Sequence, residues 1–184
     1  MYLLVGLGNF GKEYEKTRHN FGFMLIDQIT ADYRLTVIGK KFSSEVFSGE
    51  IAGEKIIALK PQTYMNNSGV AVLEAVQFYK IPPQNVIVFH DEIDLPLGAI
   101  KMKIGGGNAG HNGLKSIDSV IGKDYWRVRL GVGRPENKEF EVADFVLSKF
   151  SREEFLQVDE IKQKILENLS EIISSTKNNL AFFK

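Results

Sequence analysis

The sequence predicts a single α/β domain over residues 1–184, built on a mixed β-sheet with helices on both faces. Short apolar runs bounded by glycine, typical of buried strands, alternate with segments whose apolar residues recur at helical spacing. Two of the strand-like segments follow each other through a short turn, so the sheet is expected to contain antiparallel as well as parallel pairs. A length of 184 residues suits one domain with a sizeable core.

The elements of the first half are expected from apolar spacing and from helix-ending residues. A buried strand stops at Gly6, and Asn20 is the expected N-cap of the first helix. The second helix must end before Pro82, since proline cannot continue it. In chain order these elements are a strand at 2–5, a helix at 21–29, a hairpin of 47–51 with 55–59, and a helix at 70–79.

The second half is expected to hold three strands and one long helix. A buried strand spans 86–89, and strict alternation marks two more at 99–104 and 126–132. Lys101, Lys103, Arg127 and Arg129 alternate with the apolar residues of those two strands. Residues 151–154 form a capping-box pattern that opens an amphipathic helix reaching Ile172.

Composition excludes several classes of protein. The chain has no cysteine, which excludes disulfides, thiolate zinc sites and a cysteine nucleophile. No apolar stretch approaches the roughly 18 residues of a spanning helix, and the start lacks a signal-peptide pattern. We therefore expect a cytoplasmic protein, with a monomer as the default because no apolar surface stripe is evident.

Charge is balanced overall but uneven along the chain. The 23 basic residues equal the 23 acidic ones, yet residues 101–138 carry eight Lys or Arg against three acids. A solvated surface and a phosphate-binding face explain this excess about equally well.

The early glycine motif, Gly6 to Gly11, has the G-x-G-x-x-G spacing of a dinucleotide site. Such a site needs a helix to start on its glycines, but the segment 12–18 is charged and has no apolar stripe. Dinucleotide binding is therefore not favoured.

The three histidines and the acidic run after the expected strand 86–89 offer no zinc pattern. Residues 90–94 could gather a hard cation, but an acidic turn before Pro96 is the simpler interpretation. His19 lies in a polar segment after a strand, with no apolar pattern to bury it, which is a typical place for a general base. Turn-like asparagines at 9, 66–67, 108 and 112 suit either backbone turns or contacts to an oxyanion and a peptide.

Six separated blocks, in order, resemble the bacterial-type peptidyl-tRNA hydrolase family. The resemblance runs from the first strand to at least Phe150. The blocks are 5–9, Tyr14 with 17–20, 60–66 with 68–69, 90–92 with 94–96, 105–107 with 110–115, and 129–135.

The resemblance implies hydrolysis of the ester between a peptide, or an N-blocked amino acid, and the 3′ end of tRNA. This activity recycles tRNA and needs neither a metal nor a cofactor. His19 would activate water and Asp91 would orient it, as in a triad with water in place of serine. Asn66 and Asn112 would hold the peptide and the reacting carbonyl, and Asn9 would favour N-blocked substrates.

The resemblance also assigns contacts to the tRNA and to its 3′ end. Tyr14, Tyr64 and Met65 match substrate or 3′-end contacts, where aromatic rings can stack on unpaired bases. Lys101, Lys103 and Arg134 match a rim that meets acceptor-side phosphates. No membrane and no obligate protein partner are implied.

Two departures from the family pattern stand close to these residues. Phe10 replaces a common proline, and Asn108–Ala109 stand where glycine is common. Three alternatives stay open: an RNA-binding protein without turnover, a nucleotide-dependent oxidoreductase, and a metal-dependent hydrolase. Loss of His19, Asp91 or Asn66 would indicate the first alternative. A binding change on titration with a dinucleotide would indicate the second, and sensitivity to chelators the third.

Overall fold

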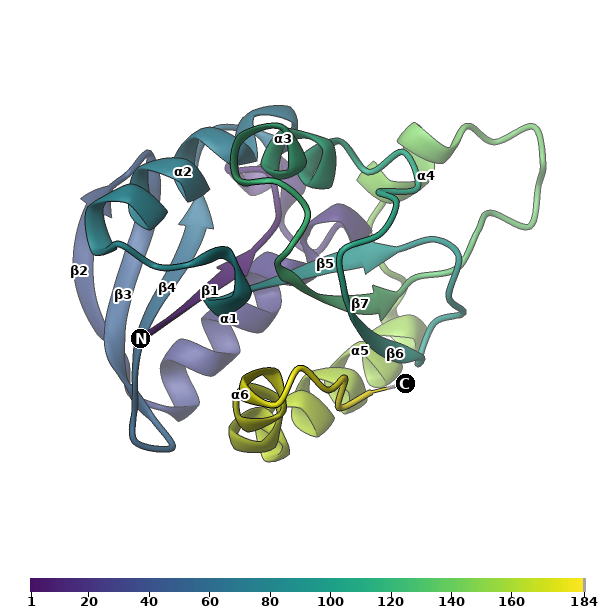
Figure 1. Cartoon of the computed structure of the whole chain (residues 1–184). Coiled ribbons are helices and arrows are strands. Elements are labelled where there is room, and N and C mark those ends of the chain that lie inside the picture. Colours follow the sequence, from purple (N-terminus) through teal and green to yellow (C-terminus); the bar gives the residue numbers. More distant parts are fainter. Residues whose placement is uncertain (184) are drawn as a thin grey trace.

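The computed structural model describes residues 1–183, and its centre is a seven-stranded sheet of order β2-β3-β4-β1-β5-β7-β6 (Figure 1). Neighbouring strands among β4, β1, β5 and β7 are parallel, whereas β2–β3–β4 and β6–β7 pair antiparallel. The strands are β1 (Tyr2–Gly6), β2 (Thr36–Lys41), β3 (Ser44–Ile51), β4 (Glu54–Pro61), β5 (Val86–Glu92), β6 (Ile100–Ile104) and β7 (Trp126–Gly131). The sheet is thus mixed, as expected.

Helices cover both faces of the sheet (Figure 1). Alternate residues of β1 enter two separate cores, with Leu4 in one and Leu3 and Val5 in the other. The first core is shared with α1 (Phe21–Asp32), α5 (Arg152–Glu167) and α6 (Leu169–Lys177), and the second with α2 (Ser68–Tyr79) and α3 (Asn112–Ile121). The predicted fold class is confirmed.

Four features of the secondary structure differ from the prediction. The edge strand β2, the helix α3 and the six-residue helix α4 (Val142–Leu147) were not expected. β2 is largely exposed and bulged, α3 begins directly after the glycine-rich loop and is only ten residues long, and α4 is too short for a periodic pattern. The expected long C-terminal helix is two helices that meet at Asn168. Its apolar stripe continues across the break because both helices pack into the same core.

The glycine motif serves close packing between β1 and α1. A Cβ on Gly6 would lie 2.3 Å from the Gly22 carbonyl oxygen, and one on Gly8 would lie 2.6 Å from the Phe23 ring. The helix begins only at Phe21, well beyond Gly11. These glycines therefore let the helix approach the strand, which agrees with the weak case for a dinucleotide site.

The carboxyl ends of β1 and β5 lie side by side at the middle of the sheet. Leu7, directly after β1, donates its backbone N–H to the Phe89 carbonyl of β5 (3.0 Å). The short 3-10 turn Arg18–Asn20 and the start of α3 come to this edge as well. In residues 1–183, no helix combines the length and the apolar character needed to cross a membrane.

Candidate functional site

The centre of the site is a buried carboxylate between two histidines. Nδ1 of His19 lies 2.9 Å from both carboxylate oxygens of Asp91, 72 residues away in the sequence. Nε2 of His111 lies 2.9 Å from Oδ1 of the same carboxylate. The sequence paired His19 with Asp91 only through a resemblance, and His111 was not among the expected site residues.

The protonation of both rings follows from their partners. An ionised carboxylate only accepts hydrogen bonds, so His19 donates from Nδ1 and keeps a lone pair on Nε2. His111 donates from Nε2, and its Nδ1 accepts the backbone N–H of Leu114 (3.4 Å), which caps α3. His19 can therefore take a proton at Nε2, while both nitrogens of His111 are engaged.

The electrostatics of this cluster favour an ionised Asp91. Burial raises the pKa of the Asp91 carboxyl, but the charges and hydrogen bonds of His19 and His111 lower it far below its usual value. Burial lowers the pKa of His19, and Asp91 more than offsets this, leaving the pKa of His19 raised above 6.5. Asp91 thus orients the ring and stabilises its protonated form.

His19 is buried, contrary to the expectation of an open polar segment. Only 9% of the residue is exposed. The segment before it is covered by residues 148–154: Arg18 donates its backbone N–H to Ser148, and its guanidinium binds Glu154 bidentately (2.7 and 2.8 Å). The cover comes from a part of the chain 130 residues away, which local sequence patterning does not reveal.

A second buried histidine, His90 on β5, is expected to make the protein acid-sensitive. Its Nδ1–H donates to the Asp91 carbonyl, and burial, with the nearby His111, lowers its pKa from 6.5 to about 3. Below pH 6.5 His90 binds a proton in the unfolded chain but not in the native protein. The free energy of unfolding therefore falls by about 1.4 kcal/mol per pH unit between pH 6.5 and 3.

The contributions of His19 and Asp91 to the free energy of unfolding change mostly outside the range from pH 6.5 to 3. The stabilisation from the raised pKa of His19 is fully present below pH 6.5, and that from Asp91 is lost only as the pH falls below its unfolded value near 3.8. Urea unfolding at pH 6.5 and 5.0 should show a loss of about 2 kcal/mol from His90. In His90→Gln this part of the loss should vanish, and an equal loss in both proteins would contradict the assignment.

Asn9 is held with its amide in one orientation. Its Oδ1 accepts the backbone N–H of Met65 (2.7 Å), which leaves both Nδ2 hydrogens free. The side chain of Asn20 accepts from the Asn9 backbone N–H and donates to the Asn9 carbonyl, each at 2.8 Å. Asn20 is the N-cap residue of α1, as expected, but its side chain clamps Asn9 and makes no hydrogen bond to the first turn of the helix.

The residue before Met65 has an unusual backbone. Tyr64 has φ 56° and ψ 159°, a region that side-chain-bearing residues rarely adopt, at a cost on the order of 1–3 kcal/mol. This conformation directs the Met65 N–H toward Asn9. The Tyr64 ring packs on Phe10 (4.3 Å between centroids) and meets Tyr14 edge-on (6.4 Å), so the departure at Phe10 contributes to an aromatic cluster.

Asn66 and Asn112 lie on neighbouring elements with exposed side chains. Asn66 is in the 3-10 turn Met65–Asn67, and Asn112 is the first residue of α3. The turn packs closely on the helix, since a Cβ on Gly113 would lie 2.6 Å from the Met65 sulfur. The structure thus gathers Asn9, Met65, Asn66 and Asn112 at one edge.

The basic residues of β6 and β7 divide into exposed and buried groups. Lys101 is exposed and Lys103 is partly so, and a Cβ on Gly106 would lie 3.0 Å from Lys103 Nζ. Burial, with Arg129 and Arg127, lowers the pKa of Lys103. Arg127, expected on a solvated or phosphate-binding face, is fully buried and pairs with Asp118 (2.7 Å).

The expected acidic turn is partly a strand. β5 continues through Asp91 to Glu92, and Glu92 pairs with Arg129 (3.0 Å). Asp94 pairs with Arg134 (2.6 Å) on the surface. These acids neutralise neighbouring arginines, which agrees with the interpretation that set aside a hard-cation site.

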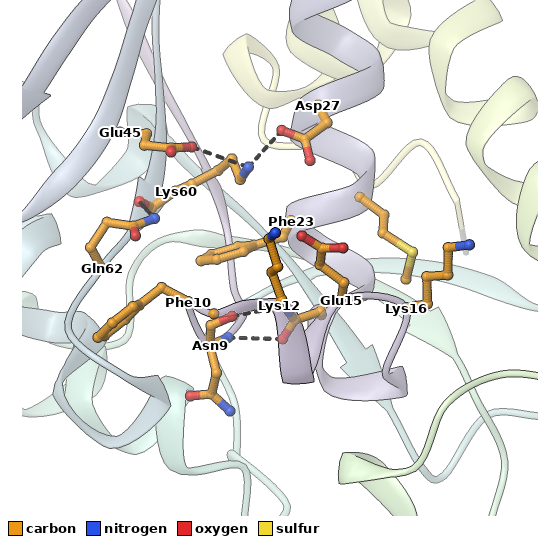
Figure 2. A pocket seen from close by; sticks show the side chains of 13 residues that line it. Asn9, Phe10, Lys12, Glu15, Lys16, Phe23, Asp27, Glu45, Lys60 and Gln62 are labelled. Carbon is orange, nitrogen blue, oxygen red and sulfur yellow. Dashed lines mark hydrogen bonds and ion pairs between the residues drawn. The ribbon is translucent and has the colours of Figure 1, made fainter.

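Two hollows lie near these residues, and Asn9 itself lines the larger of them. The smaller, about 350 Å³, is lined by His19, Asp91, His111, Asn112 and Arg134. The larger, about 460 Å³, is lined by Asn20, Phe23 and charged residues, with Lys60 held between Asp27 (2.7 Å) and Glu45 (3.2 Å). Figure 2 shows the Asn9 amide pointing away from Lys60. Among the described residues, none lines both hollows.

His19, Asp91 and His111 are also a donor set that could hold a divalent transition metal. In the present arrangement each facing histidine nitrogen hydrogen-bonds Asp91. That the reaction needs no metal stays a prediction.

The fold and the site together define a single-domain α/β protein whose central feature is a histidine held by a buried carboxylate, an arrangement suited to general-base chemistry. The model of the family described as peptidyl-tRNA hydrolase matches residues 3–183. The chain belongs to the peptidyl-tRNA hydrolase family.

Individual relatives agree over nearly the whole chain. The peptidyl-tRNA hydrolase of Rickettsia bellii (strain RML369-C) is 48% identical over 185 residues, which cover 100% of this chain and 98% of the relative. That of Aliarcobacter butzleri is 53% identical over 162 residues, covering 88% and 86%. A crystal structure of the Acinetobacter baumannii enzyme superposes with a TM-score of 0.89 at 37% identity, covering 100% of this chain and 96% of that one.

Proposed function

We propose that this hydrolase cleaves peptidyl-tRNA with a water molecule activated by His19. The observation that carries the proposal is the contact of His19 Nδ1 with both oxygens of buried Asp91, at 2.9 Å each. It leaves Nε2 as the free base of a site that contains no serine or cysteine nucleophile in contact with it.

In the proposed reaction one proton moves from water to His19 and then from His19 to the leaving oxygen. Water attacks the ester carbonyl carbon as His19 Nε2 takes its proton, and the carbonyl oxygen becomes an oxyanion. The bond to the tRNA 3′ oxygen then breaks, and His19 returns the proton to that oxygen. The products are a peptide carboxylic acid and tRNA with a free 3′-hydroxyl, which is then available for reuse.

Three asparagine amides are suited to the acyl side of the substrate. Asn9 Nδ2 has free hydrogens in a fixed orientation, and a blocked amino terminus offers a carbonyl oxygen that can accept them. Asn66 and Asn112 carry exposed amides that can bind any peptide backbone or donate to the oxyanion. Contacts of this kind do not depend on the peptide's side chains.

Aromatic and basic groups are suited to the tRNA side. Tyr14 and Tyr64, which contact each other, offer rings on which unpaired 3′-end bases can stack, and Phe10 packs on Tyr64. Met65 would border the acyl group. Lys101, Lys103 and Arg134 would meet acceptor-side phosphates, which suits a substrate class of many tRNA sequences.

All of these residues come from one chain, so a monomer would suffice. The proposed place of action is the cytoplasm, where translation forms peptidyl-tRNA.

The test is release of label from N-acetyl-aminoacyl-tRNA, with unblocked aminoacyl-tRNA as the control substrate. The native protein should cleave the first and spare the second. The matched variant Asn9→Asp keeps an oxygen for the Met65 N–H but replaces the free donors by a carboxylate oxygen. It should lose most of the preference for the blocked substrate, whereas tRNA binding without any cleavage would favour the RNA-binding alternative.

A further inference from the structure

We propose that a buried cluster of Asp118, Tyr125 and Arg127, together with Asn108, positions the glycine-rich loop that carries His111 and Asn112. This inference rests on the proposed function, since it concerns how that site is held in its working geometry. These four are positioning residues, because they act through the loop and contact neither His19 nor Asp91.

The cluster is a buried polar unit in which both terminal nitrogens of Arg127 have partners, whereas its Nε has none among the described residues. Arg127 on β7 is fully buried, and its Nη2 donates to Asp118 Oδ1 of α3 (2.7 Å). The Tyr125 hydroxyl donates to the same oxygen (2.8 Å). A buried charge pair of this kind makes a poor source of net stability, so we look for its role in the segment that it holds in place.

The loop is tied to the cluster at two successive residues. Arg127 Nη1 donates to the Gly107 carbonyl (2.9 Å), and Asn108 Nδ2 lies 3.4 Å from Asp118 Oδ2. From Asn108 the contacts lead directly to the site: its carbonyl accepts the backbone N–H of His111 (2.8 Å). His111 then holds Asp91 and caps the helix that begins at Asn112.

The rest of the loop has little else to fix it. Gly105, Gly106, Ala109 and Gly110 all have positive φ, and a Cβ on Gly107 or Gly110 would meet nothing within 4 Å. Such a segment has many accessible backbone conformations when it is not tied down. The hydrogen bonds from Arg127 and Asp118 therefore select the conformation that delivers His111 to Asp91.

Asn108 is informative because it is a departure from the family pattern. Glycine at this position could make neither the side-chain bond to Asp118 nor the one that Gly110 N–H donates to Asn108 Oδ1 (3.3 Å). Asn108, at a position where glycine is common, thus adds two restraints to the loop.

The test compares kcat and KM for N-acetyl-aminoacyl-tRNA across three variants. Asn108→Gly removes the side-chain links and leaves the buried pair intact. Asn108→Asp keeps the shape but places a carboxylate beside Asp118. Arg127→Lys keeps the charge opposite Asp118 but cannot hold Gly107 at the same time.

We expect kcat to fall about tenfold to a hundredfold in Asn108→Asp and Arg127→Lys, and less in Asn108→Gly, with KM nearly unchanged. Asp124→Asn, an exposed acid next to Tyr125, is the matched control and should behave like the native protein. Thermal unfolding of the two Asn108 variants should stay close to native. Unchanged kcat in both Asn108→Asp and Arg127→Lys would overturn the proposal.

A second readout separates this proposal from the proposed function. The Nε2 proton of His111, held by Asp91, should give a downfield NMR signal that weakens or broadens in Asn108→Asp. If the native protein shows no cleavage but this signal responds, the positioning role stands and the proposed function fails. If cleavage is present and the signal is unaffected by every variant, the positioning role is wrong.

Discussion

Replacing His19 by alanine is expected to reduce cleavage of N-acetyl-aminoacyl-tRNA by on the order of 10²–10⁴-fold, while tRNA binding changes little. General-base catalysis supplies a factor of this size, and His19 Nε2 is the nitrogen with a free lone pair beside Asp91. The measurement is single-turnover hydrolysis combined with a binding titration on uncleaved tRNA.

His19→Gln is the sharper variant of this experiment. Its side-chain amide can still donate to Asp91, so the buried carboxylate keeps a partner, but it has no basic nitrogen. Cleavage should fall as far as in His19→Ala, with a smaller effect on thermal unfolding. Retention of activity within tenfold of native in His19→Gln would show that another group activates the water.

The second large effect is expected for Asp91→Asn, with a fall in kcat on the order of 10³–10⁴-fold. An asparagine amide offers one acceptor where the carboxylate serves both His19 and His111. One ring must then reorient or change its tautomer, and the protonated form of His19 loses its counter-charge. The pH dependence of kcat should also shift to lower pH, since Asp91 raises the pKa of His19.

Glu92→Gln is the matched control for Asp91→Asn. Glu92 is the next acid of the same strand, and it pairs with Arg129 rather than with a histidine. Its loss should change kcat far less than Asp91→Asn does. Similar losses in both variants would mean that the effect comes from disturbing β5 and not from orienting His19.

The sequence predicted the sheet and the main helices because periodic burial leaves a local pattern in the chain. β2 and α4 escaped prediction because an exposed edge strand and a six-residue helix carry almost no such pattern. α3 was missed as well, although Leu114 and Ile117 lie three residues apart and are buried, because this short helix follows directly on a glycine-rich loop. The break at Asn168 was also hidden, since a continuous apolar stripe follows both helices into one core.

The site was predicted through family motifs rather than through geometry. Nothing local shows that His19 reaches Asp91, or that Ser148 and Glu154 cover the turn before it. His111 lies between Gly110 and Asn112, inside one of the blocks that resemble the family. Its place next to Asn112 was therefore a signal that it lies at the same edge of the sheet as the other site residues. Arg127 looked like a surface cation because strand alternation cannot distinguish solvent from a buried partner on another element.

The place of β1 in the sheet has a consequence for how the enzyme is made. β1 leaves the ribosome before its two neighbours, β4 and β5, which end at residues 61 and 92. β1 can therefore pair with β4 only after about a third of the chain has been made, and its other edge stays unpaired until about half has been made. His19 and Asp91 meet through this same late pairing, so nascent chains shorter than about 90 residues contain the base without its partner. Catalytic competence should appear late in synthesis, together with closure of the sheet.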